Sequence, residues 1–269
     1  MAVPGRVVVT GATGIAAATA RQLAASGRRV FVISATDGNA QALAADLGEA
    51  AAGACTADLR VEAEAEQAFA AADTALGGMD GLVAVAGGSG RRAGDGPLHE
   101  IPLAGWDATL ALNLTTAFLA TREALRHFLA GRVPGSIVLT TSVLGWSPSP
   151  RYFATHAYAA TKAALCGMTR TLAAAYAPDG IRVNAVAPGL VRTPMARRAA
   201  EDAEILAFAA RKQPITGDLL AAEDVAAACC FALDAAQLTG QVIALDGGWT
   251  VSEGQELSPH EIPNQSGEH

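Results

Sequence analysis

The sequence has no apolar run long enough to span a membrane. Its alanine-rich stretches are interrupted by Arg, Asp or Gly within about a dozen residues, whereas a membrane helix needs about 20 apolar residues. The first residues, Met1 to Arg6, lack the apolar core of a signal peptide and lead directly into a pattern typical of a strand. We therefore expect a protein without a membrane span that works in the cytoplasm.

Cysteine is scarce and lacks the spacing of a metal site or a redox motif. The four cysteines are Cys55, Cys166, Cys229 and Cys230, and none belongs to a Cys-x-x-Cys pair. We expect no metal site and no disulfide framework, but reduced and mostly buried thiols.

Positive charge is sparse as well. The chain carries 19 basic and 26 acidic residues, a formal net charge of −7, and its adjacent arginines form only the pairs Arg28-Arg29, Arg91-Arg92 and Arg197-Arg198. A nucleic-acid-binding surface needs clustered positive charge, so no nucleic-acid partner is expected.

What the sequence does contain is a regular alternation of short β-branched runs with long alanine-rich stretches. The runs predict strands at residues 6–10, 29–33, 51–57, 81–86, 135–141, 181–187 and 241–245. The stretches between them predict helices near residues 14–26, 39–47, 61–76, 104–130, 156–177 and 222–235. This order predicts a doubly wound α/β fold of the Rossmann type, a parallel sheet with helices on both faces.

No shift in composition marks a second domain. We expect one dinucleotide-binding and catalytic domain over residues 1–251, followed by a polar tail at 252–269. The Gly- and Pro-rich residues 87–103 are expected to form a functional loop, and residues 190–220 a lid over a substrate site.

A glycine turn follows the first predicted strand. Gly11 permits a tight turn and Gly14 permits the backbone to approach a pyrophosphate at the start of the next helix. The alternative is an ordinary glycine-rich turn without a ligand. The candidate nucleotide-binding residues of this turn are Thr10, Gly11, Thr13, Gly14 and Ile15.

The end of the second predicted strand bears on the choice between NAD and NADP. A carboxylate there would bind the ribose 2′-hydroxyl of NAD, but the position is Ser34, and Asp37 three residues later could instead cap a helix. The missing carboxylate favours NADP slightly.

Tyr158 and Lys162 are spaced to lie on one face of a helix. An ammonium beside a phenol favours the phenolate, so Tyr158 is a candidate acid/base with a lowered pKa. The alternative is a core tyrosine and a solvated lysine. Lys162 is one of only two lysines beside 17 arginines, which favours a position that requires a compact ammonium.

Two further polar residues stand at informative places. Ser142 follows the fifth predicted strand, where its hydroxyl could hold a carbonyl oxygen at the ligand-binding edge of a parallel sheet, or simply begin a turn. Asn113 lies inside the helix predicted at 104–130, where asparagine usually has a polar reason to occur, or is an exposed surface residue.

Together these features resemble the short-chain dehydrogenase/reductase family over about residues 5–250. The matching motifs, in order along the chain, are Thr10-Gly11 with Gly14, Asp58-Leu59, Trp106-Asp107, Asn113, Ser142, Tyr158 with Lys162, Asn184, Pro188-Gly189 with Val191 and Thr193, and Asp246-Gly247-Gly248.

The resemblance implies hydride transfer between a nicotinamide cofactor, NAD(P), and a small alcohol or carbonyl substrate. It implies that Tyr158 exchanges the substrate proton, Ser142 binds the carbonyl oxygen, and Lys162 binds the nicotinamide ribose. It also implies that Asn113 supports a proton-relay water. The residues through which the resemblance implies cofactor contacts are Ser34, Asp58, Leu59, Ala86, Gly87, Pro188, Gly189, Val191 and Thr193, together with the glycine turn, Tyr158 and Lys162.

Related proteins are commonly homotetramers, which implies a homo-oligomer, a tetramer or a dimer. Two other functions stay open at this point. A non-redox member of the same superfamily, an epimerase or dehydratase, is suggested by the two-residue gap between Gly11 and Gly14. A regulatory protein that binds a dinucleotide without chemistry is the other.

Candidate residues at the rim of the substrate site are Leu144, Trp146, Phe153 and His156, together with the loop Gly90–Pro97 and the lid at 195–212. Arg91, Arg92 and Arg151 could attract an anionic substrate, or could be ordinary solvated arginines.

Overall fold

The computed structural model describes residues 3–36 and 38–252, and in them the predicted strands form one parallel sheet. The sheet order is β3-β2-β1-β4-β5-β6-β7, and each neighbouring pair is parallel. The strands are β1 (Arg6–Thr10), β2 (Arg29–Ser34), β3 (Ala51–Thr56), β4 (Gly81–Ala84), β5 (Ser136–Thr140), β6 (Arg182–Pro188) and β7 (Val242–Leu245). The order reverses direction between β1 and β4, which is where a doubly wound sheet opens a crevice for a ligand.

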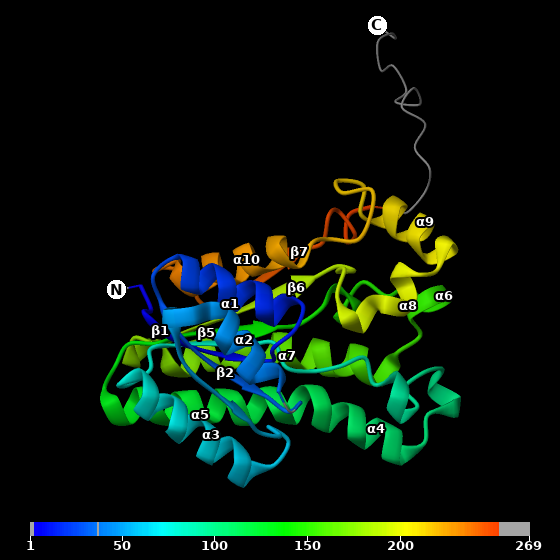
Figure 1. Cartoon of the computed structure of the whole chain (residues 1–269). Coiled ribbons are helices and arrows are strands. Elements are labelled where there is room, and N and C mark those ends of the chain that lie inside the picture. Colours follow the sequence, from blue (N-terminus) through cyan, green and yellow to red (C-terminus); the bar gives the residue numbers. More distant parts are fainter. Residues whose placement is uncertain (1–2, 37, 253–269) are drawn as a thin grey trace, which may run out of the picture.

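Helices cover both faces of the sheet (Figure 1). On one face α1 (Ile15–Ala25), α2 (Asn39–Leu47) and α10 (Ala222–Asp234) pack in one apolar core. On the other face α3 (Glu62–Leu76), α5 (Thr116–Gly131) and α7 (His156–Tyr176) pack in a second core. Because both faces are covered, the central strands are buried along their length, as with Val7, Val8 and Val9 of β1 at 0% exposure. The predicted fold class is therefore confirmed.

The helix expected at 104–130 is interrupted. It consists of α4 (Leu103–Leu110), a π-helical segment at Ala111–Thr115 and α5. A π-helical turn is rare and often marks a functional position, because it inserts an extra residue into the helix. The buried Asn113 lies within this turn.

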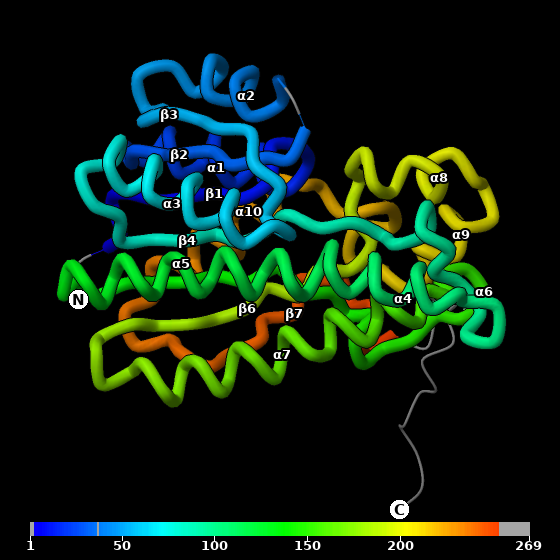
Figure 2. The backbone as a smooth tube through the Cα atoms, turned by 90° about the horizontal axis from the view of Figure 1, so that it is seen from below, coloured from blue at the N-terminus to red at the C-terminus, as the bar shows by residue number. Residues whose placement is uncertain are grey.

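Three short helices lie together at the end of the molecule that bears the carboxyl ends of the strands (Figures 1 and 2). They are α6 (Pro150–Phe153), α8 (Arg197–Ala200) and α9 (Ala203–Lys212). The two ends of the segment that contains α8 and α9 lie next to each other. Val191 and Leu220 form a parallel bridge, and the buried Gln213 forms hydrogen bonds with the main chain of both Leu190 and Asp218.

Two of the sequence expectations concern residues outside the described part. They are the cap at Asp37 and the polar tail at 252–269, of which only Ser252 is described. In the described part, no helix combines the length and the hydropathy needed to cross a bilayer. All four cysteines are unpaired, and Cys166 and Cys229 are buried.

Candidate active site

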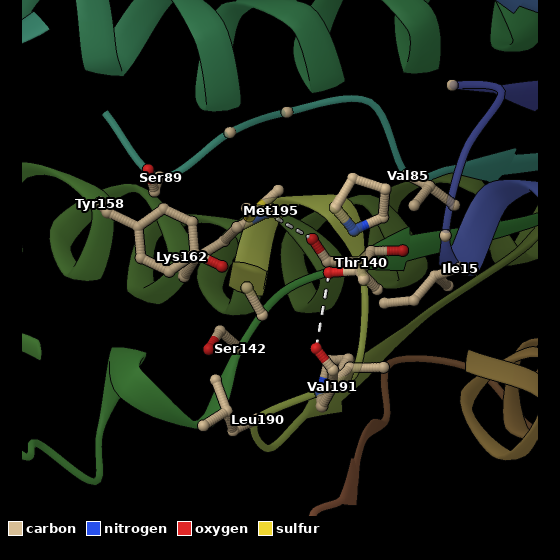
Figure 3. Close-up of a pocket in the computed structure, with 18 of the residues that line it drawn as sticks. Ile15, Val85, Ser89, Thr140, Ser142, Tyr158, Lys162, Leu190, Val191 and Met195 are labelled. Atoms are coloured by element: carbon tan, nitrogen blue, oxygen red, sulfur yellow. Dashed lines mark hydrogen bonds between the residues drawn. The ribbon is translucent and has the colours of Figure 1, made fainter. Parts of the chain in front are cut away.

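A cavity of about 280 Å³ opens at the carboxyl ends of the central strands. It brings together residues that are far apart in the sequence. Of the predicted site residues, those that line it are Gly11, Thr13, Gly14, Ile15, Ala86, Gly87, Ser142, Tyr158, Lys162, Pro188, Gly189, Val191 and Thr193. Figure 3 shows Ser142 and Tyr158 toward one end of this cavity, and Ile15 and Val85 toward the other.

The glycine turn at the Ile15 end is built for close approach of a ligand. Gly11 and Gly14 have φ of 93° and 54°, in the left-handed region that favours glycine. The following helix α1 has no side-chain cap and no acidic residue in its first turn. Its first N–H groups and positive end therefore face the cavity without a competing side chain, which suits a phosphate.

Thr193, on the opposite wall of the cavity, lies close to this turn. A β-carbon at Gly14 would lie 2.9 Å from Cγ2 of Thr193. Thr10 supports the same region from beneath, since its buried Oγ1 accepts hydrogen bonds from the backbone N–H groups of Val85 and Ala86 at 3.1 and 3.2 Å. Thr10 does not line the cavity.

Tyr158 lies in the first turn of α7, and a carboxylate holds that turn. Asp95, from the loop after β4, is 4% exposed and accepts hydrogen bonds from the backbone N–H groups of Ala157 (3.0 Å) and Tyr158 (2.8 Å). A carboxylate at a helix N-terminus satisfies unpaired N–H groups and complements the helix dipole. Asp95 belongs to the loop expected to be functional at 87–103, but its contact with α7 was not predictable, because no local pattern connects residues separated by 62 positions.

Lys162 follows one turn later and lines the cavity, although its side chain is almost fully buried. Its side chain is 5% exposed, its Nζ donates to the main-chain oxygen of Thr140 at 2.8 Å, and it lies 5.4 Å from the centre of the Tyr158 ring. An ammonium has three N–H donors, so this contact leaves others for a ligand. Thr140 also lines the cavity and its buried Oγ1 has no partner among the described residues.

The pKa values in this pair differ from the sequence expectation. Burial raises the pKa of Tyr158 to about 12, and hydrogen bonding with Ser142 acts in the opposite direction. Burial also lowers the pKa of Lys162 to about 8, because a buried ammonium loses its hydration. The predicted lowering of the Tyr158 pKa by Lys162 is therefore wrong in this structure, and Tyr158 is a neutral phenol near pH 7.

Ser142 lies just beyond β5 and faces the cavity. Its backbone is extended, and its Oγ accepts a hydrogen bond from the N–H of Leu144 at 3.2 Å. The hydroxyl proton remains available for a substrate oxygen, because a hydroxyl can accept and donate at once.

Asn113 does not line the cavity, and its amide is fully engaged. Its Oδ1 accepts from the N–H of Gly88 at 3.1 Å, and its Nδ2 donates to the oxygens of Gly88 and Thr109 at 2.9 and 3.0 Å. The π-helical turn thus connects α4 to the loop after β4, and Asn113 is buried rather than a surface residue.

Three predicted cofactor residues also lie outside the cavity lining. Ser34 is 8% exposed at the end of β2 and Leu59 is 4% exposed. Asp58 is paired with Arg60 at 2.6 Å, and hydrogen bonding to this guanidinium lowers the pKa of Asp58.

Part of the predicted rim is correctly placed. Leu144, Phe153 and Arg91 line the cavity, whereas Trp146, His156, Arg92 and Arg151 do not. Three further lining residues belong to segments that were expected at the site: Ser89 to the loop at 87–103, and Met195 and Arg198 to the lid at 190–220. Thr155 also lines the cavity and was not predicted.

A dinucleotide fits the groups that line this cavity. The glycine turn with an uncapped helix suits a pyrophosphate, and Lys162 with the unpartnered Thr140 hydroxyl suits a polar sugar. The cavity runs from these groups to Ser142 and Tyr158, so one extended ligand could contact both ends.

Comparison with known proteins supports one family. A family model described as enoyl-(acyl carrier protein) reductase matches residues 9–250. Cis-4-hydroxycyclohexanecarboxylate dehydrogenase of Sinomonas cyclohexanicum is 40% identical over 250 residues, which cover 90% of this chain and 95% of the relative.

Two solved structures are also similar. A short-chain type dehydrogenase/reductase from Mycobacterium ulcerans superposes with a TM-score of 0.84 at 28% identity, covering 94% of this chain and 92% of the other. A variant of actinorhodin polyketide ketoreductase with NADPH superposes with a TM-score of 0.81 at 30% identity, covering 91% of this chain and 97% of the other.

Proposed function

Since the chain belongs to the short-chain dehydrogenase/reductase family and is an NAD(P)-dependent oxidoreductase that interconverts alcohol and carbonyl compounds, we propose that Ser142, Tyr158 and Lys162 carry out its reaction. The observation that supports this most strongly is that the three side chains line one cavity with the glycine turn of α1. The nicotinamide, when bound, supplies or accepts the hydride.

Tyr158 is the proton donor when a carbonyl is reduced. Its pKa of about 12 keeps the phenol protonated at neutral pH, so a proton is available for the substrate oxygen as that oxygen gains charge. Ser142 donates a hydrogen bond to the same oxygen and stabilises the developing charge. In the oxidation direction the proton transfer runs in reverse: the Tyr158 phenolate, not the neutral phenol, accepts the alcohol proton, while Ser142 stays hydrogen-bonded to the same oxygen.

Lys162 orients the sugar next to the nicotinamide and stabilises the Tyr158 phenolate whenever it forms. Asn113 acts as a positioning residue in this proposal. Its three hydrogen bonds hold Gly88, and with it the loop after β4, against α4.

The cofactor is expected to contact the glycine turn and the turn from Pro188 to Thr193, with Ser34, Asp58 and Leu59 at its adenosine end. We propose a preference for NADPH, because Ser34 stands where NAD-specific sites carry a carboxylate. Titration of NADH and NADPH against tryptophan fluorescence tests this preference. An NADH affinity about tenfold higher, or about 1.4 kcal/mol, would overturn it.

Residues 190–220 are proposed to form the substrate lid, and the chain is proposed to be a cytoplasmic homo-oligomer of two or four copies. Contacts between α6 and α9 support the lid: Glu204 pairs with Arg151 and accepts a hydrogen bond from Tyr152 at 2.7 Å. Four unpaired cysteines support a reducing compartment.

The test of the catalytic assignment is Tyr158→Phe, with Tyr176→Phe at the other end of the same helix as its control. Carbonyl reduction is followed by the absorbance of the reduced nicotinamide. We expect Tyr158→Phe to lose at least about 100-fold in kcat, the upper range for a lost proton donor lying near 10⁴-fold, with cofactor affinity retained. Turnover equal to that of Tyr176→Phe would contradict the assignment.

A further inference from the structure

Two arginines from separate segments meet between the cavity and a neighbouring one, which Tyr152, Asp202 and Glu204 also line. Arg91 lies in the loop after β4 and Arg198 in α8, and both line the cavity that contains Ser142 and Tyr158. The Nη2 atoms of both donate to the same acceptor, the main-chain oxygen of Tyr152, at 3.1 Å each. The two nitrogens therefore lie no further apart than twice this distance.

No carboxylate of the described residues forms an ion pair with either guanidinium, and the acidic groups near them are engaged elsewhere. Glu204 binds Arg151 and Tyr152. Asp202 caps α9 by accepting hydrogen bonds from the N–H groups of Glu204 and Ile205.

Asp95 is the one nearby acid that partly offsets the charge of Arg91, but its oxygens bind the backbone of α7. Burial and the positive charge of Arg198 lower the pKa of Arg91, and Asp95 opposes this. This wall of the cavity therefore carries two close positive charges, neither of which is paired with a carboxylate of the described residues.

An anion between the two guanidinium groups would relieve this repulsion. Each guanidinium has five N–H donors in a planar fork, and the Tyr152 carbonyl uses only one from each arginine. The fork matches the two oxygens of a carboxylate. Neither arginine belongs to the glycine turn, and Figure 3 shows Ile15, which directly follows that turn, at the end of the cavity away from Tyr158 and Ser142.

We propose that Arg91 and Arg198 bind a carboxylate of the substrate, so that the enzyme acts on hydroxy acids and oxo acids. This proposal rests on the proposed function, because the carboxylate is bound by the arginines while the reacting oxygen lies at Ser142 and Tyr158. The carboxylate fixes the orientation of the substrate, and the apolar side chains of Leu144 and Phe153, which line the same cavity, contact its body.

The test compares oxo acids of increasing chain length, each with its uncharged primary amide, by steady-state reduction at fixed reduced cofactor. Wild-type protein is compared with Arg91→Gln and Arg198→Gln. The matched controls are Arg92→Gln and Arg197→Gln, which change the adjacent exposed arginines that do not line the cavity.

We expect the wild-type kcat/KM of at least one acid to exceed that of its amide by about 10- to 100-fold, the range for charge-assisted hydrogen bonds. Arg91→Gln and Arg198→Gln should remove most of this ratio through KM, whereas the control variants retain it. Amide turnover and cofactor affinity should change little in all four variants.

Several outcomes would overturn the proposal. If the arginines only brace the Tyr152 carbonyl, Arg198→Gln lowers acid and amide turnover equally and the ratio stays constant. Equal wild-type turnover of acids and amides also contradicts the carboxylate site while leaving the proposed function intact. A protein that reduces no carbonyl compound, with Tyr158→Phe indistinguishable from wild type, contradicts the proposed function instead.

Discussion

Lys162 is a buried cation whose charge is compensated only in part. Among the described residues, its Nζ donates one hydrogen bond, to the main-chain oxygen of Thr140, and no acidic side chain pairs with it. Burial lowers the pKa of Lys162 from an ordinary value of 10.5 to about 8, because folding removes the ammonium from water and so disfavours its charged form. At neutral pH the folded protein therefore carries a destabilised ammonium, which a ligand oxygen would stabilise.

This environment predicts a pH-dependent stability. Below pH 8 the buried charge costs the folded state about 3 kcal/mol, and this cost disappears as the pH rises toward 10.5, because the unfolded chain still binds the proton that the folded chain has lost. Relative to Lys162→Met, the free energy of unfolding of the wild type should therefore increase between pH 8 and pH 10. Urea denaturation of the ligand-free protein measures it.

The control for this experiment is Lys212→Met, which replaces the other lysine of the chain. Lys212→Met should keep the wild-type pH dependence. Tyr158 acts in the opposite direction only above pH 10, where its raised pKa makes the folded state lose stability, so the measurement stays below that pH. Parallel profiles for wild type and Lys162→Met would contradict the account.

At the scale of single residues, the motif spacings predicted which side chains meet but not their ionisation. Tyr158 and Lys162 share a helix face because they are four positions apart, and that rule is local. The pKa of Tyr158 depends on burial by segments distant in the sequence, so its direction could not be predicted. The same holds for Asp95 and Arg198, which reach the site through tertiary contacts alone.

At the scale of elements, two features of the turn between β1 and α1 disfavour a side chain at Gly14. They are the backbone conformation of Gly14 and its close approach to Thr193. Gly14→Ala places a side chain at φ of 54° and brings its β-carbon to 2.9 Å from Cγ2 of Thr193. The φ of 54° with a ψ of −124° is a conformation that residues with a β-carbon rarely adopt, at a cost of about 1–3 kcal/mol, and the contact forces the turn or the opposite wall to move. We expect nicotinamide cofactor affinity to fall at least about tenfold in a fluorescence titration.

Gly48→Ala is the matched control for the turn. Gly48 has φ of 60° and ψ of −133°, close to the values of Gly14, and a β-carbon there would meet no atom within 4 Å, so this variant has the backbone cost without the collision. It should bind the cofactor as the wild type does. The double variant Gly14→Ala with Thr193→Ser removes Cγ2 and should recover part of the affinity; no recovery would argue against the contact as the cause.

The helices and strands were predictable because the sequence signals that define them, alanine-rich stretches for helices and β-branched runs for strands, are local. Buried parallel strands appear as continuous apolar runs, and β1 and α2 were predicted with the bounds that the structure has. The break of the 104–130 helix was not predicted, because the π-helical turn depends on the three hydrogen bonds of Asn113 to Gly88 and Thr109. Only the unusual asparagine indicated that this position was special.

At the scale of the whole molecule, α7 exposes a face of small residues. Ala164, Gly167, Thr171 and Ala174 are exposed and lie at helical spacing on one side of the helix. A second helix can approach such a face closely. We expect the wild type to sediment at two or four times the chain mass of 27.2 kDa.

Gly167→Arg tests this face, because a β-carbon at Gly167 would meet nothing within 4 Å of the same chain and arginine is the better helix former. The variant should keep its fold by circular dichroism and sediment as a smaller species. Ala70→Arg, on the exposed side of α3, is the control and should sediment as the wild type. An unchanged sedimentation of Gly167→Arg would exclude this face as the interface.

The central claim is that one cavity holds a nicotinamide cofactor against a carbonyl bound by Ser142 and Tyr158. The most direct measurement uses a reduced cofactor that carries deuterium at the nicotinamide C4 and an oxo acid as substrate. Mass spectrometry then shows whether deuterium has reached the carbon of the product that carries the new hydroxyl group, the carbinol carbon. We predict a deuterated alcohol with the wild type and with Tyr176→Phe, and at most about one hundredth of it with Tyr158→Phe in the same time. Label that never reaches the carbinol carbon, or that reaches it equally in Tyr158→Phe, would contradict the account.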